Sequence, residues 1–235
     1  MKTNDYGIFN LVPFNRAIGA KHVEALKRSI NKWGTGGRKI ICVKLKLFDK
    51  KYLLYIIDGQ HFFQALTTLN LPIEYEVNEI ITSKEQLVEY ISDLNSSSKA
   101  WITADYVKAW SYFNPSYLSL IELFNSYNIT YVDLVSVCMN TGRTKAKSHI
   151  LKGRFKITYV DYKTVLDYLD DIFGYISVSH RGLKRVIIKV FMMTYNKINY
   201  SHEEVLKRVR GNIDKVGLIT SETEREEFLK LEVFF

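Results

Sequence analysis

The sequence is poor in the residues that mark secreted, membrane and disordered proteins. It has two cysteines, Cys42 and Cys138, far apart and without the spacing of a metal site, which fits two buried thiols in a reducing compartment. Three prolines and twelve glycines are too few for a long disordered tract. No apolar run is long enough to span a bilayer, and the N-terminal MKTNDYGIFN lacks the apolar core of a signal peptide. We therefore expect a cytoplasmic protein without a membrane segment.

The residues that are abundant indicate a folded, basic protein. Hydrophobic residues make up 47% of the 235 residues and aromatic residues 14%, enough for one large domain or two small ones. Lys and Arg outnumber Asp and Glu by 33 to 25, which gives a net charge of +8. A basic balance favours a polyanionic partner, most simply nucleic acid, although it also suits a solvated lysine-rich surface.

The N-terminal third alternates between helical and extended patterns. Residues 21–33 are predicted to form an amphipathic helix ended by Gly34, with an apolar face of Val23, Leu26, Ile30 and Trp33. The segment RKIICVKLKLF alternates as a half-buried strand, and KYLLYII is predicted to be its hairpin partner. A second helix follows, and a third strand is expected over 73–80.

A strand, a glycine turn and the start of a helix meet at IIDGQHFFQAL, residues 56–66. The first N–H groups of a helix lack partners and the helix dipole is positive there, so such a junction suits an anion. Gly59 lets a phosphate approach the backbone, and Gln60 and His61 can donate hydrogen bonds to it. Asp58 can cap the helix, orient a ligand hydroxyl or help hold Mg²⁺. An Asp N-cap beside a surface histidine is the structural alternative.

The order of elements around this motif resembles the ParB/sulfiredoxin-like superfamily. An N-terminal Asn-Arg, the helix HVEALKRSINKWG, an alternating strand and IIDGQHFFQAL follow one another as in the DGQHR-type members, over roughly residues 8–95. The resemblance implies a nucleoside triphosphate, CTP or ATP with Mg²⁺, as cofactor. It implies that the ligand is bound by Arg16, Asp58, Gly59, Gln60 and His61. Glu24 stands on the first helix, where the kinases of this fold place an acidic catalytic residue, and the ParB-like nucleases imply catalytic roles for Asp58 and His61.

Two positions depart from the pattern of that superfamily. Gln60 stands where sulfiredoxins carry their catalytic cysteine, and an amide cannot replace a thiol nucleophile. Phe62 stands where the family usually has an arginine that makes charge-assisted phosphate contacts. The absence of that arginine leaves open an interaction protein whose ligand pocket is vestigial.

The pattern becomes helical from residue 84 onward. The polar segment NSSSK at 95–99 marks a boundary, so an α+β protein is expected, with a ParB/sulfiredoxin-like mixed α/β domain at 1–95 and an all-helical domain at 96–235. Helices are predicted over 84–94, 103–113, 115–127, 130–139, 143–153, 161–172, 180–196, 201–210 and 221–231.

Residues 130–153 have the pattern of a helix-turn-helix. A short apolar helix leads to Asn140-Thr141-Gly142, interpreted as a turn with the glycine it requires, and a basic helix follows that would enter the major groove. The candidate DNA contacts are Arg143, Thr144, Lys145, Lys147, Ser148, His149, Lys152 and Arg154. A structural helical hairpin explains the pattern equally well. ParB proteins also place a helix-turn-helix directly after the nucleotide domain.

Three functions remain open at this stage. The first is a ParB-like DNA-binding protein of phage or mobile-element type, regulated by a nucleotide, acting as a homodimer in the cytoplasm of a bacterial host. The second is an enzyme, either a ParB-like nuclease or a nucleotide-dependent kinase or NTPase, which would use Asp58 and His61 with a metal ion and Glu24 or Asp49 as helpers. The third is an interaction protein that has lost its ligand.

Overall fold

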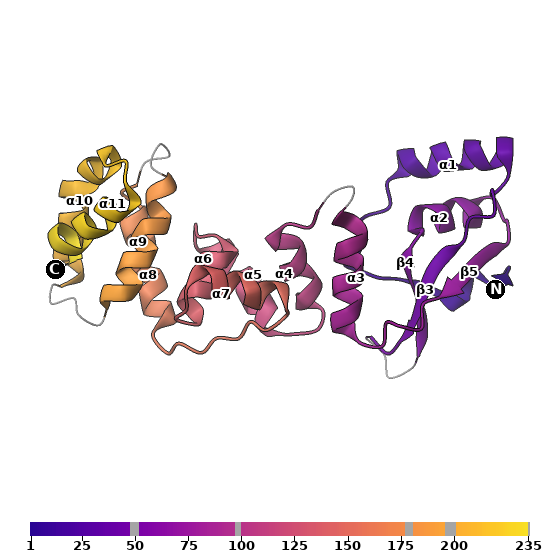
Figure 1. The fold of residues 1–235 in the computed structure, drawn as a ribbon, viewed down its shortest axis with the longest axis horizontal. Helices are drawn as coiled ribbons and strands as arrows, with labels where there is room; N and C mark the ends of the chain where they lie inside the picture. The colour runs from indigo at the N-terminus through magenta and orange to yellow at the C-terminus, as the bar shows by residue number, and fades with distance from the viewer. Residues whose placement is uncertain (48–51, 97–99, 177–180, 196–200, 235) are drawn as a thin grey trace. The chain divides into compact units, whose positions relative to one another are not determined.

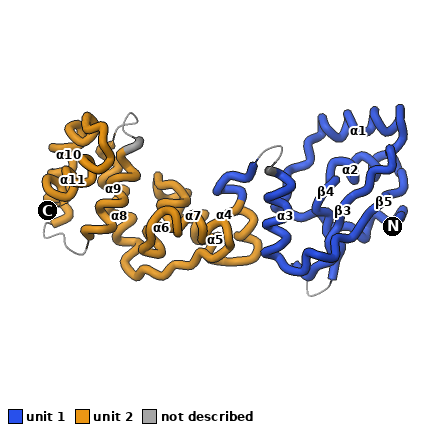
Figure 2. The backbone as a smooth tube through the Cα atoms, viewed as in Figure 1, with its two compact units in different colours: residues 1–105 blue, residues 106–235 orange. Residues whose placement is uncertain are grey.

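The structure, a computed structural model, describes residues 1–47, 52–96, 100–176, 181–195 and 201–234. These residues form a mixed α+β protein that is about 60% helical (Figure 1), so the α+β class is confirmed. The chain divides into two compact units, residues 1–105 and 106–235 (Figure 2). The central residues of the expected boundary segment, 97–99, lie outside the described residues. Among the helices that are described, none combines the length and the apolar character needed to cross a membrane.

Unit 1 is built on a sheet with the strand order β1-β5-β3-β4-β2. Its strands, β1 to β5, are Lys2–Thr3, Phe9–Leu11, Ile40–Leu45, Leu53–Asp58 and Ile73–Val77. The predicted hairpin is confirmed, because β3 and β4 pair antiparallel. Strand β2 pairs in parallel with β4, and β5 in parallel with β3. We did not predict β1, β2 or the 3-10 helix η1 (Tyr6–Ile8), because segments this short carry no readable periodicity.

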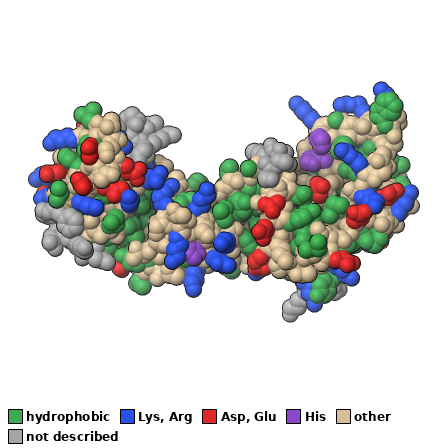
Figure 3. Space-filling model, in the orientation of Figure 1, with side chains coloured by type: hydrophobic (Ala, Val, Ile, Leu, Met, Phe, Trp, Pro, Cys, Tyr) green, Lys and Arg blue, Asp and Glu red, His purple; other side chains and the backbone are tan. Residues whose placement is uncertain are grey.

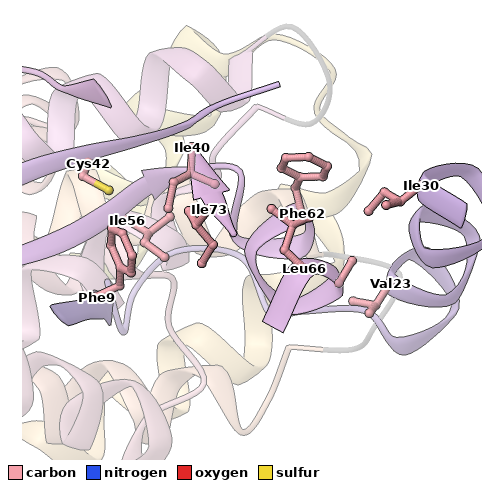
Figure 4. Close-up of a cluster of buried hydrophobic side chains, with 10 residues drawn as sticks. Phe9, Val23, Ile30, Ile40, Cys42, Ile56, Phe62, Leu66 and Ile73 are labelled. Carbon is pink, nitrogen blue, oxygen red and sulfur yellow. The ribbon is translucent and has the colours of Figure 1, made fainter. Parts of the chain in front are cut away.

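Helix α1 (Ala20–Trp33) packs on helix α2 (Gln60–Thr68), and α2 packs on strand β3 of the sheet. Figure 4 shows apolar side chains of α1 directed toward those of α2, with strand residues beyond them. The buried cluster consists of Phe9, Val23, Ile30, Ile40, Cys42, Ile56, Phe62, Ala65, Leu66 and Ile73. Burial raises the pKa of the Cys42 thiol to about 12, so this cysteine is a packing residue rather than a nucleophile.

Trp33 departs from the predicted apolar face of α1. Val23 and Ile30 are buried as expected, but Trp33 is 74% exposed, so its placement in the core was wrong. Helix α1 has 14 residues and α2 has 9, and α1 extends past α2 in Figure 1. The last turn of α1 therefore has no helix beneath it. The Nζ atom of Lys32 lies 4.7 Å from the centroid of the indole ring instead.

The third strand of unit 1 ends earlier than predicted. Strand β5 stops at Val77, and Ile80 is exposed. The Asn78 side-chain oxygen accepts hydrogen bonds from the N–H groups of Ile80 and Ile81, at 2.9 and 3.3 Å, and this local turn ends the extended run. Helix α3 (Lys84–Ser96) follows.

Unit 2 contains helices and, among its described residues, no strand. Its helices are α4 (Thr103–Ser111, within which the boundary between the units falls), α5 (Ser116–Ser126), α6 (Tyr131–Cys138), α7 (Arg143–Leu151), α8 (Tyr162–Phe173), α9 (Arg181–Thr194), α10 (His202–Leu218), α11 (Glu222–Phe228) and the π-helical η4 (Leu229–Phe234). Helix α10 was predicted to end at residue 210 but continues through Gly211. A single glycine costs a helix only about 1 kcal/mol relative to alanine, and buried residues such as Ile213 and Val216 hold the remaining turns in place.

Candidate functional site

The DGQH residues line a cavity of about 460 Å³ in unit 1, the unit-1 cavity, whose lining includes Arg16, Asp58, Gly59, Gln60 and His61. Strand β4 ends at Asp58, Gly59 has φ 86° and ψ 18°, and α2 begins at Gln60. This left-handed conformation favours glycine, and a Cβ on Gly59 would lie 3.0 Å from Cγ2 of Ile40. Glycine is therefore required both by the backbone conformation and by packing against β3.

His61 is fixed in the cavity by a backbone hydrogen bond. The N–H group of Gly19 donates to its Nε2 atom at 3.0 Å, so the proton of the neutral ring is on Nδ1. Burial, together with the nearby His22, lowers the pKa of His61, and the two rings meet edge to face at 4.8 Å. At neutral pH the ring is therefore uncharged, with its Nδ1–H as hydrogen-bond donor.

Asp58 holds the turn and does not cap the helix with its side chain. Its Oδ1 atom accepts a hydrogen bond from the N–H group of Gly59 at 2.8 Å, and the N-cap position of α2 is Gly59 itself. The N–H group of Phe63 donates to the carbonyl of Gly59 at 2.8 Å and closes the first helical turn. The N–H groups that precede it belong to the free end of α2, which attracts negative charge.

Cations outnumber carboxylates in the lining of the unit-1 cavity. Arg16, Arg38 and Lys39 line it against one carboxylate, that of Asp58. The Nη2 atom of Arg16 donates to the carbonyl of Asn95 at 3.4 Å, and Lys39 forms an ion pair with Glu76. This balance favours an anionic ligand.

Glu24 does not join the other predicted catalytic residues. It lies on the exposed side of α1, where its carboxylate pairs with Lys27 at 2.9 Å, and it is not part of the cavity lining. Asp49 lies outside the described residues. Within the described part of the chain, no three His, Cys, Asp or Glu side chains are grouped so that they could share a metal ion.

Sequence reasoning missed Arg38, Lys39 and Asn95 as cavity residues. The hairpin carried a signal for the first two, because Ile41 pairs with Asp58 and the residues just before one antiparallel strand lie beside those just after its partner. Asn95 comes from the end of α3, and no local pattern connects it with the DGQH turn.

The turn between α6 and α7 uses asparagine where glycine was expected. Asn140 has φ 45°, and the N–H group of Thr141 donates to the carbonyl of Ser136 at 2.9 Å, which is a Schellman motif. Gly142 has φ −67° and is the N-cap of α7, so the interpretation of Gly142 as the glycine that the turn requires was wrong. Asparagine tolerates the left-handed region because its side chain can hydrogen-bond locally.

Aromatic side chains hold the C-terminal end of α7. The hydroxyl of Tyr117 donates to the carbonyl of His149 at 3.0 Å, and Nε1 of Trp110 donates to the carbonyl of Leu151 at 3.2 Å. Carbonyls in the last turn of a helix lack partners within the helix. The two contacts fix α7 against α4 and α5.

The predicted DNA contacts on and after α7 fall into two groups. The exposed residues are Thr144, Lys145, Lys147, Lys152 and Arg154, and the partly buried residues are Arg143, Ser148 and His149. Arg143 forms an ion pair with the buried Asp133, whose Oδ2 atom accepts a hydrogen bond from the Thr130 hydroxyl at 2.6 Å. Arg143 therefore connects α7 to α6.

The exposed residues of α7 and of the segment after it include five cations and no acid. We call these five exposed cations, Lys145, Lys147, Lys152, Arg154 and Lys156, the α7 surface. The sequence has no Asp or Glu between Asp133 and Asp161. Figure 3 shows Lys and Arg side chains gathered around a histidine in this part of unit 2. Such a group of cations is able to contact the phosphate backbone of a nucleic acid.

A larger cavity, of about 940 Å³, lies in unit 2 and is lined by residues of α6, α9 and α11. Two of the charged side chains in its wall hold parts of unit 2 together. Arg143 pairs with Asp133, and Nζ of Lys184 donates to the carbonyl of Asn128 at 3.4 Å.

Neither a scan against protein-family models nor a search of curated proteins found a match to this chain.

Proposed function

We propose that this chain is a ParB-like DNA-binding protein, which contacts duplex DNA through the α7 surface and binds a phosphate-bearing ligand in the unit-1 cavity. The observation that carries the DNA-binding part is the set of five exposed cations from Lys145 to Lys156, in a stretch of sequence without acids. Thr144 and Ser148 are one helical turn apart on the same side of α7. They supply hydroxyl groups for base edges beside the cations that contact phosphates.

A separate observation favours the phosphate-bearing ligand. The N-terminal end of α2, the side chain of His61 and three cationic side chains line one cavity of about 460 Å³. A helix N-terminus with neighbouring cations favours a phosphate, and the cavity volume lies in the range of small-molecule sites. The resemblance of the DGQH motif makes a nucleoside triphosphate, CTP or ATP with Mg²⁺, the first ligand to test.

Fluorescence anisotropy of a labelled DNA duplex tests the DNA-binding part. Replacing Lys145, Lys147 and Lys152 together by Gln should weaken binding by about 10-fold or more, because fewer counter-ions are released on binding. Lys215→Gln is the matched control, since Lys215 is an exposed lysine of α10 next to Asp214. It should leave the affinity unchanged. No binding by the wild type, or equal binding by both variants, would argue against the α7 surface as the DNA contact.

The enzymatic alternative is distinguished by turnover. Asp58 and His61 both line the unit-1 cavity, so a nuclease or NTPase would act there. Incubation with plasmid DNA or ATP in the presence of Mg²⁺ should then produce nicked DNA or free phosphate, and Asp58→Ala should abolish the product. Binding without turnover supports the proposed function, and the absence of binding and turnover alike leaves the interaction protein.

A further inference from the structure

We infer that Arg38 is a phosphate-binding residue of the unit-1 cavity and that Phe62 positions its guanidinium group. The inference rests on the proposed phosphate-binding function of this cavity and deepens it, because Arg38 lies outside the DGQH motif. The ligand class that it implies is a phosphate chain with several negative charges, represented by a triphosphate.

The β-hairpin brings Arg38 to the cavity. Arg38 stands just before β3, and Ile41 of β3 pairs with Asp58 at the end of β4. Gly59 lies directly against Ile40, so Arg38 and the first turn of α2 are at the same end of the hairpin. Arg38 and Phe62 both line the cavity.

The ring of Phe62 supports the guanidinium group of Arg38. Its Cζ atom lies 5.9 Å from the ring centroid, which is within the range of a cation–π contact. Phe62 is anchored in the buried cluster between α1, α2 and the sheet (Figure 4), so its ring is a fixed surface. A cation–π contact uses the charge of the guanidinium and leaves its N–H groups free to donate to a ligand.

Arg38 differs from the other cations of the cavity in its partners. Lys39 is paired with Glu76, and Arg16 donates to the carbonyl of Asn95. Among the described residues, no carboxylate lies within ion-pair distance of Arg38, and its side chain contacts the ring of Phe62. An arginine that is held in place without a counter-charge is suited to bind two phosphate oxygens at once.

Calorimetric titration of the full chain with inorganic triphosphate, ATP and CTP, each with and without Mg²⁺, tests the inference. Arg38→Ala should weaken binding by about 10- to 100-fold, because a charge-assisted hydrogen bond is lost. Lys32→Ala is the matched control, since Lys32 is an exposed cation of the last turn of α1 that lies over Trp33 and outside the cavity lining. Equal affinity for triphosphate and nucleotides would show that the phosphate chain is recognised. Tighter binding of a nucleotide would show that its base or ribose adds contacts. Either result supports the inference if Arg38→Ala weakens the binding.

The role of Phe62 is tested by a double-mutant cycle. Phe62→Leu keeps an apolar side chain in the core but removes the ring. It should weaken binding in the wild-type background and add little to the loss in Arg38→Ala, because Phe62 acts through Arg38. Additive losses would overturn the positioning role. Binding that His61→Ala weakens and Arg38→Ala leaves unchanged would overturn the inference alone, whereas no binding of any probe by the wild type would overturn the phosphate-binding function with it.

Discussion

Replacing Gly59 by alanine tests the turn that shapes the unit-1 cavity. Gly59 has φ 86°, and a left-handed backbone costs a residue with a Cβ about 1–2 kcal/mol. The new Cβ would lie 3.0 Å from Cγ2 and 3.3 Å from Cα of the buried Ile40, and overpacking of this kind costs about 1–3 kcal/mol. Alanine also restricts the unfolded chain, which offsets about 0.4–1 kcal/mol. We expect Gly59→Ala to lower the free energy of unfolding of unit 1 by about 2–4 kcal/mol.

Gly36→Ala separates backbone strain from the packing contact. Gly36 has φ 62°, and a Cβ there would meet nothing within 4 Å. Only the backbone cost applies, about 1 kcal/mol after the unfolded-state offset. Urea unfolding combined with amide hydrogen exchange in β3 and β4 is the appropriate assay, because the two units can unfold in separate transitions. Equal destabilisation by the two substitutions would refute the close packing of the DGQH turn against β3.

Three further predictions concern pH, an ion pair and a helix interior. Burial and His22 lower the pKa of His61 in the folded protein below the ordinary value of 6.5. As the pH falls below 6.5, the unfolded chain therefore binds the proton before the folded protein does. Stability is lost as the pH falls further, until the pKa of the folded protein is passed. His61→Gln should flatten this decline in melting curves recorded between about pH 5 and 7, and an unchanged decline would exclude His61 as its source. Asp133→Asn removes the partner of the half-buried Arg143. It should lower the free energy of unfolding of unit 2, measured by urea unfolding, by about 1–3 kcal/mol. A loss no larger than that caused by a substitution at an exposed residue would mean that the ion pair does not hold α6 to α7. Gly211→Ala should raise the stability of α10 by about 0.5–1 kcal/mol, because a Cβ at Gly211 would meet nothing within 4 Å, whereas a lower melting temperature would contradict a helix that runs through this position.

The parts of the fold with long, regular patterns could be predicted from the sequence. Periodicity identified α1, the β3–β4 hairpin and the succession of helices in unit 2, because burial of one face imposes a repeat on the side chains. It misplaced Trp33, since a helical pattern does not show whether another element covers the last turn. It also missed β1 and β2, whose pairing with β5 and β4 is a long-range contact between short segments.

Site residues that are adjacent in sequence could be predicted, whereas site residues that folding brings together could not. Asp58, Gly59, Gln60 and His61 are adjacent in sequence and line one cavity. Arg38 joins them through the register of the hairpin, which the pattern of alternation alone does not determine. The basic residues after Gly142 were recognisable as a group in the sequence. The sequence does not show which of them form ion pairs within unit 2, as Arg143 does with the buried Asp133.

The dependence of DNA affinity on salt tests the DNA-binding claim most directly. The logarithm of the binding constant falls with the logarithm of salt concentration by about 0.9 for each phosphate contact with B-DNA. Contacts by all five cations of the α7 surface would give a slope of about −4.5, a loss of about 500-fold between about 50 and 200 mM salt. Replacing Lys145, Lys147 and Lys152 by Gln should reduce the slope to about −2, while Lys215→Gln leaves it unchanged. A slope near zero, or the same slope for both variants, would contradict DNA binding through the α7 surface.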